Sequence, residues 1–124
     1  SGQYNVSRCR RHGEEGAARL ACCEFVNHTL AMLFLLNERH MPFYKWAFRA
    51  AKELPKLSKL IPTLEALLRE PDEDTIERVS AAVIEELRAQ GLTDGGWDFL
   101  EPHAYAVMRR IRNPEIAALH IMEV

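Results

Sequence analysis

The chain has 124 residues and a mass of 14.2 kDa, which is enough for one domain with its own hydrophobic core. Its 48% hydrophobic and 27% charged residues are typical of a folded globular protein and exclude disorder as the main state. The formal net charge of −2 argues against a general nucleic-acid binder, and we expect no DNA partner.

The first part of the chain predicts a long helix after an irregular start. Residues 1–12 show no strong hydrophobic period and are expected to form an irregular lead-in. From Gly16 onward, apolar residues recur at helical spacing until Asn37 to His40, before Met41-Pro42. Around Leu30 this segment is apolar on every side, so we expect it to be the central, buried first helix. Its predicted inward residues are Ala17, Leu20, Ala21, Phe25, His28, Met32 and Leu35, with Cys22, Val26, Leu30, Leu33 and Leu36 widening the stripe.

Two shorter helices are predicted next. Pro42 can begin a helix that Pro55 ends, and Pro62 can begin another after a short apolar turn at 57–61. The apolar face of the first is expected to contain Phe43, Trp46, Ala47, Ala50, Ala51 and Leu54. That of the second is expected to contain Leu64, Leu67 and Leu68.

The remaining chain also reads as helices. Asp74 is expected to cap a fourth helix with Glu77 at the capping-box position, and Gly91 suits a left-handed end. Its inward stripe is expected to be Ile76, Val79, Val83, Ile84 and Leu87. Helical spacing returns over 102–111 and 116–122. We therefore predict an all-α fold over residues 1–124, a single compact bundle of five or six helices with a long buried first helix.

Charge is distributed unevenly along the chain. Residues 1–60 carry a net charge of +5 and residues 61–124 a net charge of −7. The basic half is suited to face an anion such as a nucleotide phosphate. The alternative is that the two halves of one bundle attract each other.

The cysteines and the apolar runs bear on location. Three cysteines, two of them adjacent, make no disulfide framework, so a reducing, cytoplasmic location is expected. Cys9 and His12 are spaced as Cys-x-x-His, but a structural zinc site needs a second well-spaced pair, and no metal is expected. The longest apolar run, Leu30 to Leu36, is shorter than the about 20 residues of a membrane span, and the N-terminus lacks the apolar core of a signal peptide. We expect no membrane partner.

The segment Asn37 to Glu53 is the most informative stretch. Lys45, Arg49 and Lys52 follow one another at i, i+4 and i+7, which places three cations on one helix face. This face is a candidate anion-binding surface, with Arg49 as a planar fork for phosphate and Lys45 as a point charge. A solvated helix surface is the alternative. A second basic cluster before the long helix consists of Arg8, Arg10, Arg11 and His12.

The chain resembles an uncharacterised helical family. The resemblance rests on Gly2-Gln3-Tyr4-Asn5-Val6 followed by Arg8, on the helix ending Phe34-Leu35-Leu36-Asn37, and on Pro42-Phe43-Tyr44-Lys45-Trp46 followed by Arg49 and Glu53-Leu54-Pro55. It is similar to domain-of-unknown-function family 4037, over roughly residues 1–68. In that family the domain follows a nucleotidyltransferase-type catalytic domain, as in kanamycin nucleotidyltransferase-like proteins.

The resemblance implies an accessory domain without catalysis of its own. The catalytic half of such proteins carries a Gly-Ser motif and metal-binding Asp-x-Asp carboxylates. This sequence has no Gly-Ser pair, and its one Asp-x-Asp, Asp72-Glu73-Asp74, follows Pro71 in a predicted connection rather than a strand. We therefore expect a C-terminal domain without its N-terminal catalytic partner, contributing to substrate or nucleotide binding and interdomain packing. No cofactor is expected in this chain. The resemblance implies that Mg²⁺ and a nucleotide would bind to the parent protein. The candidate substrate, phosphate or interdomain residues are Tyr4, Asn5, Arg8, Asn37, Tyr44, Lys45 and Arg49.

Two alternative functions remain open. Arg112-Asn113 precede His120 with six residues after Asn113, which resembles a pattern of higher-eukaryote-and-prokaryote nucleotide-binding (HEPN) domains and suggests a ribonuclease or toxin component. There, Arg112 would hold a phosphate and His120 would move a proton. Pro114 directly after the pair favours a helix cap instead. The other alternative is a helical protein-interaction module. The oligomeric state is left open.

Overall fold

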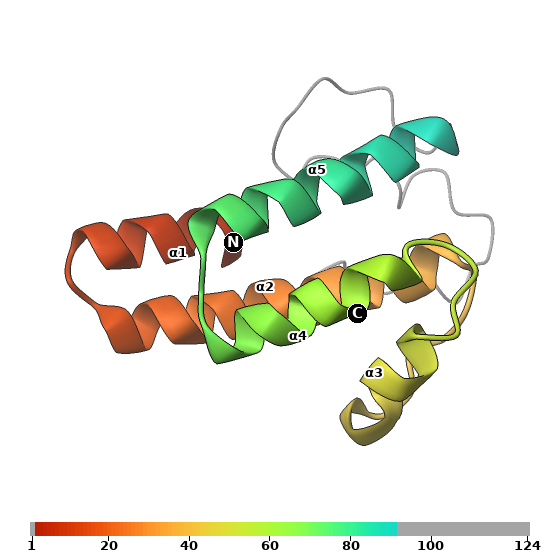
Figure 1. The fold of residues 1–124 in the computed structure, drawn as a ribbon, viewed down its shortest axis with the longest axis horizontal. Coiled ribbons are helices and arrows are strands. Elements are labelled where there is room, and N and C mark those ends of the chain that lie inside the picture. The colour runs from red at the N-terminus through yellow and green to blue at the C-terminus, as the bar shows by residue number, and fades with distance from the viewer. Residues whose placement is uncertain (1, 92–124) are drawn as a thin grey trace. The chain divides into compact units, whose positions relative to one another are not determined.

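The computed structural model describes residues 2–91, and every regular element within that range is a helix. In chain order these are α1 (Gly2–Arg11), α2 (Glu15–Leu36), α3 (Tyr44–Ala51), the 3-10 helix η1 (Ser58–Leu60), α4 (Ile61–Arg69) and α5 (Glu73–Ala89) (Figure 1). The all-α fold class is thereby confirmed. The chain forms two compact units, Ser1–Val79 and Ser80–Val124, and α5 begins in the first and ends in the second. The helices expected over 102–111 and 116–122 lie outside the described residues.

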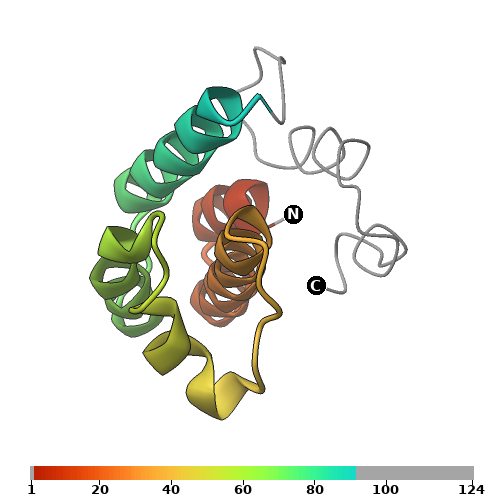
Figure 2. The same cartoon turned by 90° about the vertical axis from the view of Figure 1, so that its right-hand side faces the viewer.

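Residues 1–12 differ from the expected irregular lead-in, because Gly2–Arg11 form helix α1. This helix packs along α2 and buries Val6 completely (Figure 2). It ends in a Schellman turn, in which Gly13 has a φ of +72° and its amide donates to the Arg10 carbonyl at 3.0 Å. Among the described side chains of α1, Val6 is the one that is fully buried. A helix that buries so few side chains shows no regular spacing of apolar residues, so the sequence pattern does not indicate it.

The expected long buried helix is present as α2, second in the chain because α1 precedes it. Thirteen of its 22 residues are buried, including all from Thr29 to Leu36. Two predicted inward residues, Ala17 and Leu20, are exposed, since Ala18 and Ala21 face inward in those turns.

By length and composition, α2 is also the one helix among the described residues that is suited to cross a membrane. The uninterrupted apolar run is shorter than a membrane span, but the 22-residue helix as a whole is long and apolar enough to cross one. The core helix of a soluble protein and a signal sequence share these properties, so they are weak evidence for a membrane span. In this protein 61% of the apolar window is buried inside the protein, as in a core helix.

The two short helices form with different boundaries from those expected. α3 begins at Tyr44 rather than at Pro42, because Phe43 still has the extended backbone of an N-cap, with a φ of −52° and a ψ of 147°. η1 provides the short turn before α4, and Pro62 lies in the first turn of α4 as predicted. Ile61, Leu64 and Leu67 are buried. Leu68 is exposed, contrary to expectation.

The start of α5 is capped by Asp72 rather than by the expected Asp74. The Asp72 carboxylate accepts hydrogen bonds from the Thr75 amide, at 3.0 Å, and from the Thr75 hydroxyl. Both bonds lower the pKa of Asp72, and the bond from the Thr75 hydroxyl has the larger effect. Asp74 instead lies in the first turn with Glu73, where negative charge is favourable. The predicted stripe of Ile76, Val79, Val83, Ile84 and Leu87 is buried, and Gly91 has the predicted left-handed backbone.

Candidate functional site

Helix α3 exposes Tyr44 and Trp46 and buries Ala47 and Ala51, while Phe48 and Ala50 are partly buried. Ala47 and Ala51 are fully buried, and α3 is in contact with α2. Trp46 is 53% exposed and Phe43 67% exposed, so the prediction that both belong to the core is wrong. Small alanine side chains let the two helix backbones approach closely, and the large rings are thereby turned toward solvent.

Five residues form one exposed surface on this helix, which we call the α3 surface. Its members are Phe43, Tyr44, Lys45, Trp46 and Arg49. Tyr44 is 68% exposed, and its ring lies 4.7 Å from that of Phe43, centroid to centroid, with an angle of 56° between the planes. The guanidinium of Arg49 lies 5.2 Å from the centroid of the Trp46 ring. This is cation–π geometry, which is worth about 0.5–1 kcal/mol at an exposed site.

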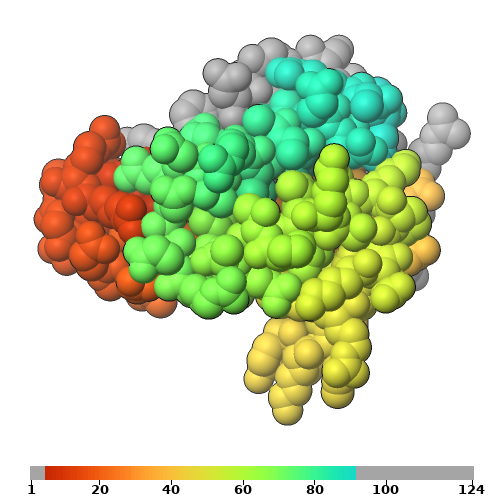
Figure 3. All heavy atoms as spheres, viewed as in Figure 1, coloured from red at the N-terminus to blue at the C-terminus, as the bar shows by residue number. Residues whose placement is uncertain are grey.

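The α3 surface protrudes from the body of the first unit. Figure 3 shows the yellow residues of α3 and its flanking chain as a projection below the green helices. Large exposed aromatic side chains are uncommon on a protein surface unless they bind something. The protrusion is convex, and its chemistry combines flat apolar rings with positive charge.

The cations of the α3 surface differ from other basic residues nearby. Within residues 2–91, neither Lys45 nor Arg49 has a carboxylate partner. Lys52, on the next turn, is paired with Glu65 at 3.4 Å between Nζ and Oε1. The charges of Lys45 and Arg49 are therefore available to an external anion, whereas that of Lys52 is partly compensated.

Asn37 has a structural role at the base of α3. Its Nδ2 donates to the Leu33 carbonyl at 2.7 Å and to the Lys56 carbonyl at 3.1 Å. Its Oδ1 accepts a hydrogen bond from the Lys56 amide at 2.9 Å. The sequence singles out Asn37 as a candidate binding residue, but in the structure its side-chain amide joins the two ends of the segment that carries α3.

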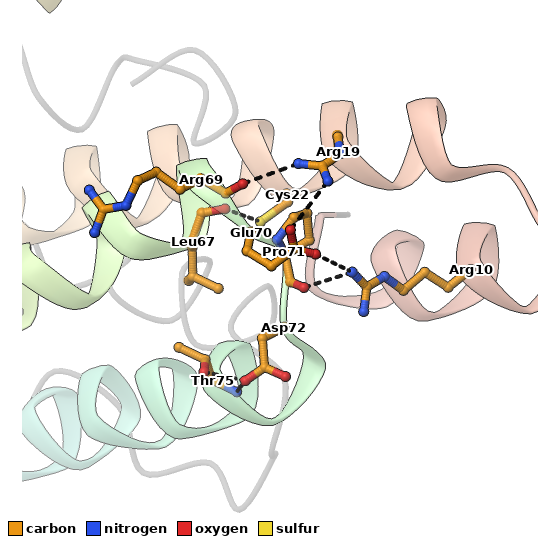
Figure 4. A network of polar contacts seen from close by, with 9 residues as sticks. All are labelled: Arg10, Arg19, Cys22, Leu67, Arg69, Glu70, Pro71, Asp72 and Thr75. Atoms are coloured by element: carbon orange, nitrogen blue, oxygen red, sulfur yellow. Dashed lines mark hydrogen bonds and ion pairs between the residues drawn. The ribbon is translucent and has the colours of Figure 1, made fainter.

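The basic cluster at the start of the chain is divided between structure and surface. The Arg10 guanidinium donates to the Pro71 carbonyl at 2.7 Å and lies 3.6 Å from Glu70 (Figure 4). Arg19 also reaches Glu70, at 3.3 Å, and the Arg69 carbonyl at 3.2 Å. These contacts tie α1 and α2 to the connection after α4. Arg8, Arg11 and His12 are exposed.

The predicted site residues fall at two places in the first unit. Asn5, which is half-buried, and Arg8, which is exposed, lie on α1, while Tyr44, Lys45 and Arg49 lie on α3. In Figure 1 α3 lies below the C-terminal half of α2, whereas α1 lies along its N-terminal half. Arg8 therefore belongs to a different part of the first unit from Lys45 and Arg49. Tyr4 lies in the helical backbone of α1, and its side chain is outside the described part.

The remaining sequence candidates that the structure describes form no metal site and no disulfide. Within residues 2–91, no group of three His, Cys, Asp or Glu side chains is arranged to hold a metal ion. Cys9, Cys22 and Cys23 are free thiols. Burial, followed by the adjacent Cys23, raises the pKa of the Cys22 thiol, which lies 3.4 Å from the Leu67 carbonyl. Arg112, Asn113 and His120 lie outside the described residues.

Comparison with known proteins agrees with the resemblance seen in the sequence. Residues 1–47 match the family model described as Domain of unknown function (DUF4037). The matched part contains α1, α2 and the first half of α3, including four of the five residues of the α3 surface. No match is found among curated proteins or among solved structures.

Proposed function

We propose that this chain is a non-catalytic helical accessory domain that docks onto another protein domain through the α3 surface. The observation that carries the proposal is the protruding α3 segment, where three exposed aromatic rings lie beside Lys45 and Arg49, two cations without a carboxylate partner among residues 2–91. Tyrosine, tryptophan and arginine are the residue types that dominate binding energy in protein interfaces.

The convex shape favours a protein partner over a small molecule. Sites for small ligands are concave and bury most of the ligand's surface. A projecting helix offers a small ligand contact on one side, but it can insert its rings into a depression on a larger partner. The paired rings of Phe43 and Tyr44 suit such an anchor, because rigid rings lose little conformational entropy on binding.

The charge around α3 favours an acidic partner. Residues 38–59 contain six Lys or Arg and two Glu, a net charge of +4. Opposite charge on the partner would speed association and fix the orientation of docking. In line with the family resemblance, the partner that we propose is a nucleotidyltransferase-type catalytic domain. We propose that the two domains meet in the cytoplasm.

Nucleotide binding is the second candidate function. Lys45 and Arg49 can neutralise phosphate charge, and the Trp46 ring can stack on a base. On its own the convex surface encloses no ligand, so this role needs a partner domain to complete the site. Mg²⁺ and catalytic carboxylates would then belong to that partner.

A position-specific crosslink tests the proposal. A photoreactive phenylalanine analogue is placed at Trp46 in the protein expressed in its own cell, with the same analogue at exposed Leu20 of α2 as the matched control. We expect a crosslink at 46 to a defined acidic segment of a protein, lost in the Lys45→Glu/Arg49→Glu double variant, and none at 20. Equal labelling at both positions, or none at 46, overturns the proposal.

Thermal unfolding with ATP and Mg²⁺ separates the two candidate functions. If docking is the role of the α3 surface, nucleotide does not raise the unfolding temperature of the free chain. Nucleotide at a hundred times its dissociation constant would add about 2.7 kcal/mol of stability. A rise of that size that disappears in Lys45→Ala would replace protein docking with nucleotide binding as the primary function.

A further inference from the structure

The segment that carries α3 leaves and rejoins the first unit at one side chain. The chain departs from α2 at Asn37 and returns at Lys56, 19 residues later. The Asn37 side chain holds both ends through its bonds to the amide and the carbonyl of Lys56. A third bond, from Nδ2 to the Leu33 carbonyl, fixes the same amide group to the last turn of α2.

An asparagine is suited to this position for a chemical reason. The three bonds require two donated hydrogens and one accepting oxygen on the same planar group. A primary amide provides this combination, whereas a carboxylate provides acceptors alone. A carboxylate at position 37 would also place negative charge against the carbonyl oxygens of Leu33 and Lys56.

The backbone turns sharply directly beside both ends of this link. Glu38 has a φ of +55° and Leu57 a φ of +64°, and these are the two non-glycine residues with positive φ within residues 2–91. Such conformations cost free energy and persist where surrounding contacts impose them. Asn37 precedes one of these turns and Lys56 precedes the other, so the side-chain amide lies where the direction of the segment is set.

We infer that Asn37 is a positioning residue that fixes the α3 surface in its docking orientation. This inference rests on the proposed function. Apart from Asn37, the described residues hold α3 through the buried side chains of Ala47, Ala51 and Leu54 and through the exposed Lys52–Glu65 ion pair. Ala47 and Ala51 bury little apolar area and an exposed ion pair contributes little, so the apolar attachment comes mainly from Leu54, which lies after the end of the helix. Without the amide link, α3 stays attached but samples more orientations, and a partner must order it on binding.

Hydrogen exchange of the free chain tests the positioning role without any partner. We compare Asn37→Ala and Asn37→Asp with Asn27→Ala, which removes an exposed asparagine from the middle of α2. Amides of residues 43–56 are expected to exchange about tenfold faster or more in both Asn37 variants, with α2 unchanged from residue 18 to residue 30. The Asn27 variant is expected to match the wild-type protein.

Two outcomes overturn the inference. One is wild-type exchange over 43–56 in both Asn37 variants, and the other is faster exchange spread equally through α2 and α4, which means general destabilisation. If Asn37→Ala does not fold, Asn37→Asp decides, because it keeps the size of the side chain and the acceptor for the Lys56 amide but loses both donated bonds. The crosslink at Trp46 is then repeated with Asn37→Asp. Faster exchange in the Asn37 variants together with no crosslink in the wild-type protein would support the positioning role of Asn37 and reject docking. The failure of the inference and the failure of the proposed function are therefore distinguishable.

Discussion

The last turn of α2 places a glutamate where glycine is the favoured residue. The Glu38 amide donates to the Leu35 carbonyl at 3.0 Å, and the Arg39 amide donates to the Phe34 carbonyl at 2.9 Å. These two bonds define a Schellman turn with Glu38 at its left-handed position. The same turn ends α1, where the corresponding residue is Gly13. We therefore predict that Glu38→Gly stabilises the protein.

The size of the gain follows from two opposing terms. A left-handed conformation costs a residue with a Cβ atom roughly 1–2 kcal/mol. Glycine recovers that cost but loses about 0.5–1 kcal/mol more backbone entropy on folding. The net gain is about 0.5–1 kcal/mol, or about 2–4 °C in the unfolding temperature of a chain of this length. The Glu38 side chain is exposed, so little packing is lost.

Chemical and thermal unfolding, followed by circular dichroism, measure the effect. Glu38→Ala is the matched control, since it removes the carboxylate but keeps the Cβ atom, and it is expected to stay within about 0.5 kcal/mol of the wild-type protein. Gly13→Ala is the reverse experiment and is expected to lose about 1 kcal/mol. The reasoning is refuted if Glu38→Gly is no more stable than Glu38→Ala.

Three further predictions concern acid, thiols and the core. The pKa of Asp72 is lowered on folding, so its contribution to stability is present above pH 3.8 and is lost as the pH falls through the lowered pKa. Asp72→Asn is therefore expected to reduce the decrease in the free energy of unfolding between about pH 5 and about pH 2. A thiol reagent is expected to modify exposed Cys23 in the folded protein, whereas buried Cys22, whose pKa is raised, reacts only on unfolding; equal rates by mass spectrometry would contradict this. Leu64→Ala is expected to cost about 2–5 kcal/mol in urea unfolding and Trp46→Ala less than about 1 kcal/mol, and the reverse order would place Trp46 in the core.

Periodicity predicts the strongly amphipathic helices, and it fails where packing depends on few side chains. The stripe of α5 and the buried length of α2 follow directly from apolar spacing. α1 buries Val6 and is held through Arg10, whose partner Pro71 is 61 residues away along the chain. A contact of that kind leaves no local pattern. The cap of α5 is predicted two residues too late, because Asp72 and Asp74 have equal capping potential in the sequence.

The exposure of the charged residues in the candidate site can be predicted from the sequence, and the exposure of its aromatic rings cannot. The spacing of Lys45 and Arg49 correctly indicates an exposed cationic face. Phe43 and Trp46 are assigned to the core because large aromatic residues usually bury most of their surface. The available signal is Ala47 and Ala51, small residues at i, i+4 that suit close helix packing. The role of Asn37 depends on a partner 19 residues away, which spacing alone does not reveal.

The side chains that attach α3 to its own unit are different from those that it exposes to solvent. Ala47 and Ala51 hold it from one side, while the rings and cations lie on the others. Substitutions at positions 44, 45, 46 and 49 therefore leave the hydrophobic core untouched. Under the proposed docking function, two proteins with this architecture can keep the same internal packing and still bind different partners, because the exposed residues of an eight-residue helix can change at little cost in folding stability.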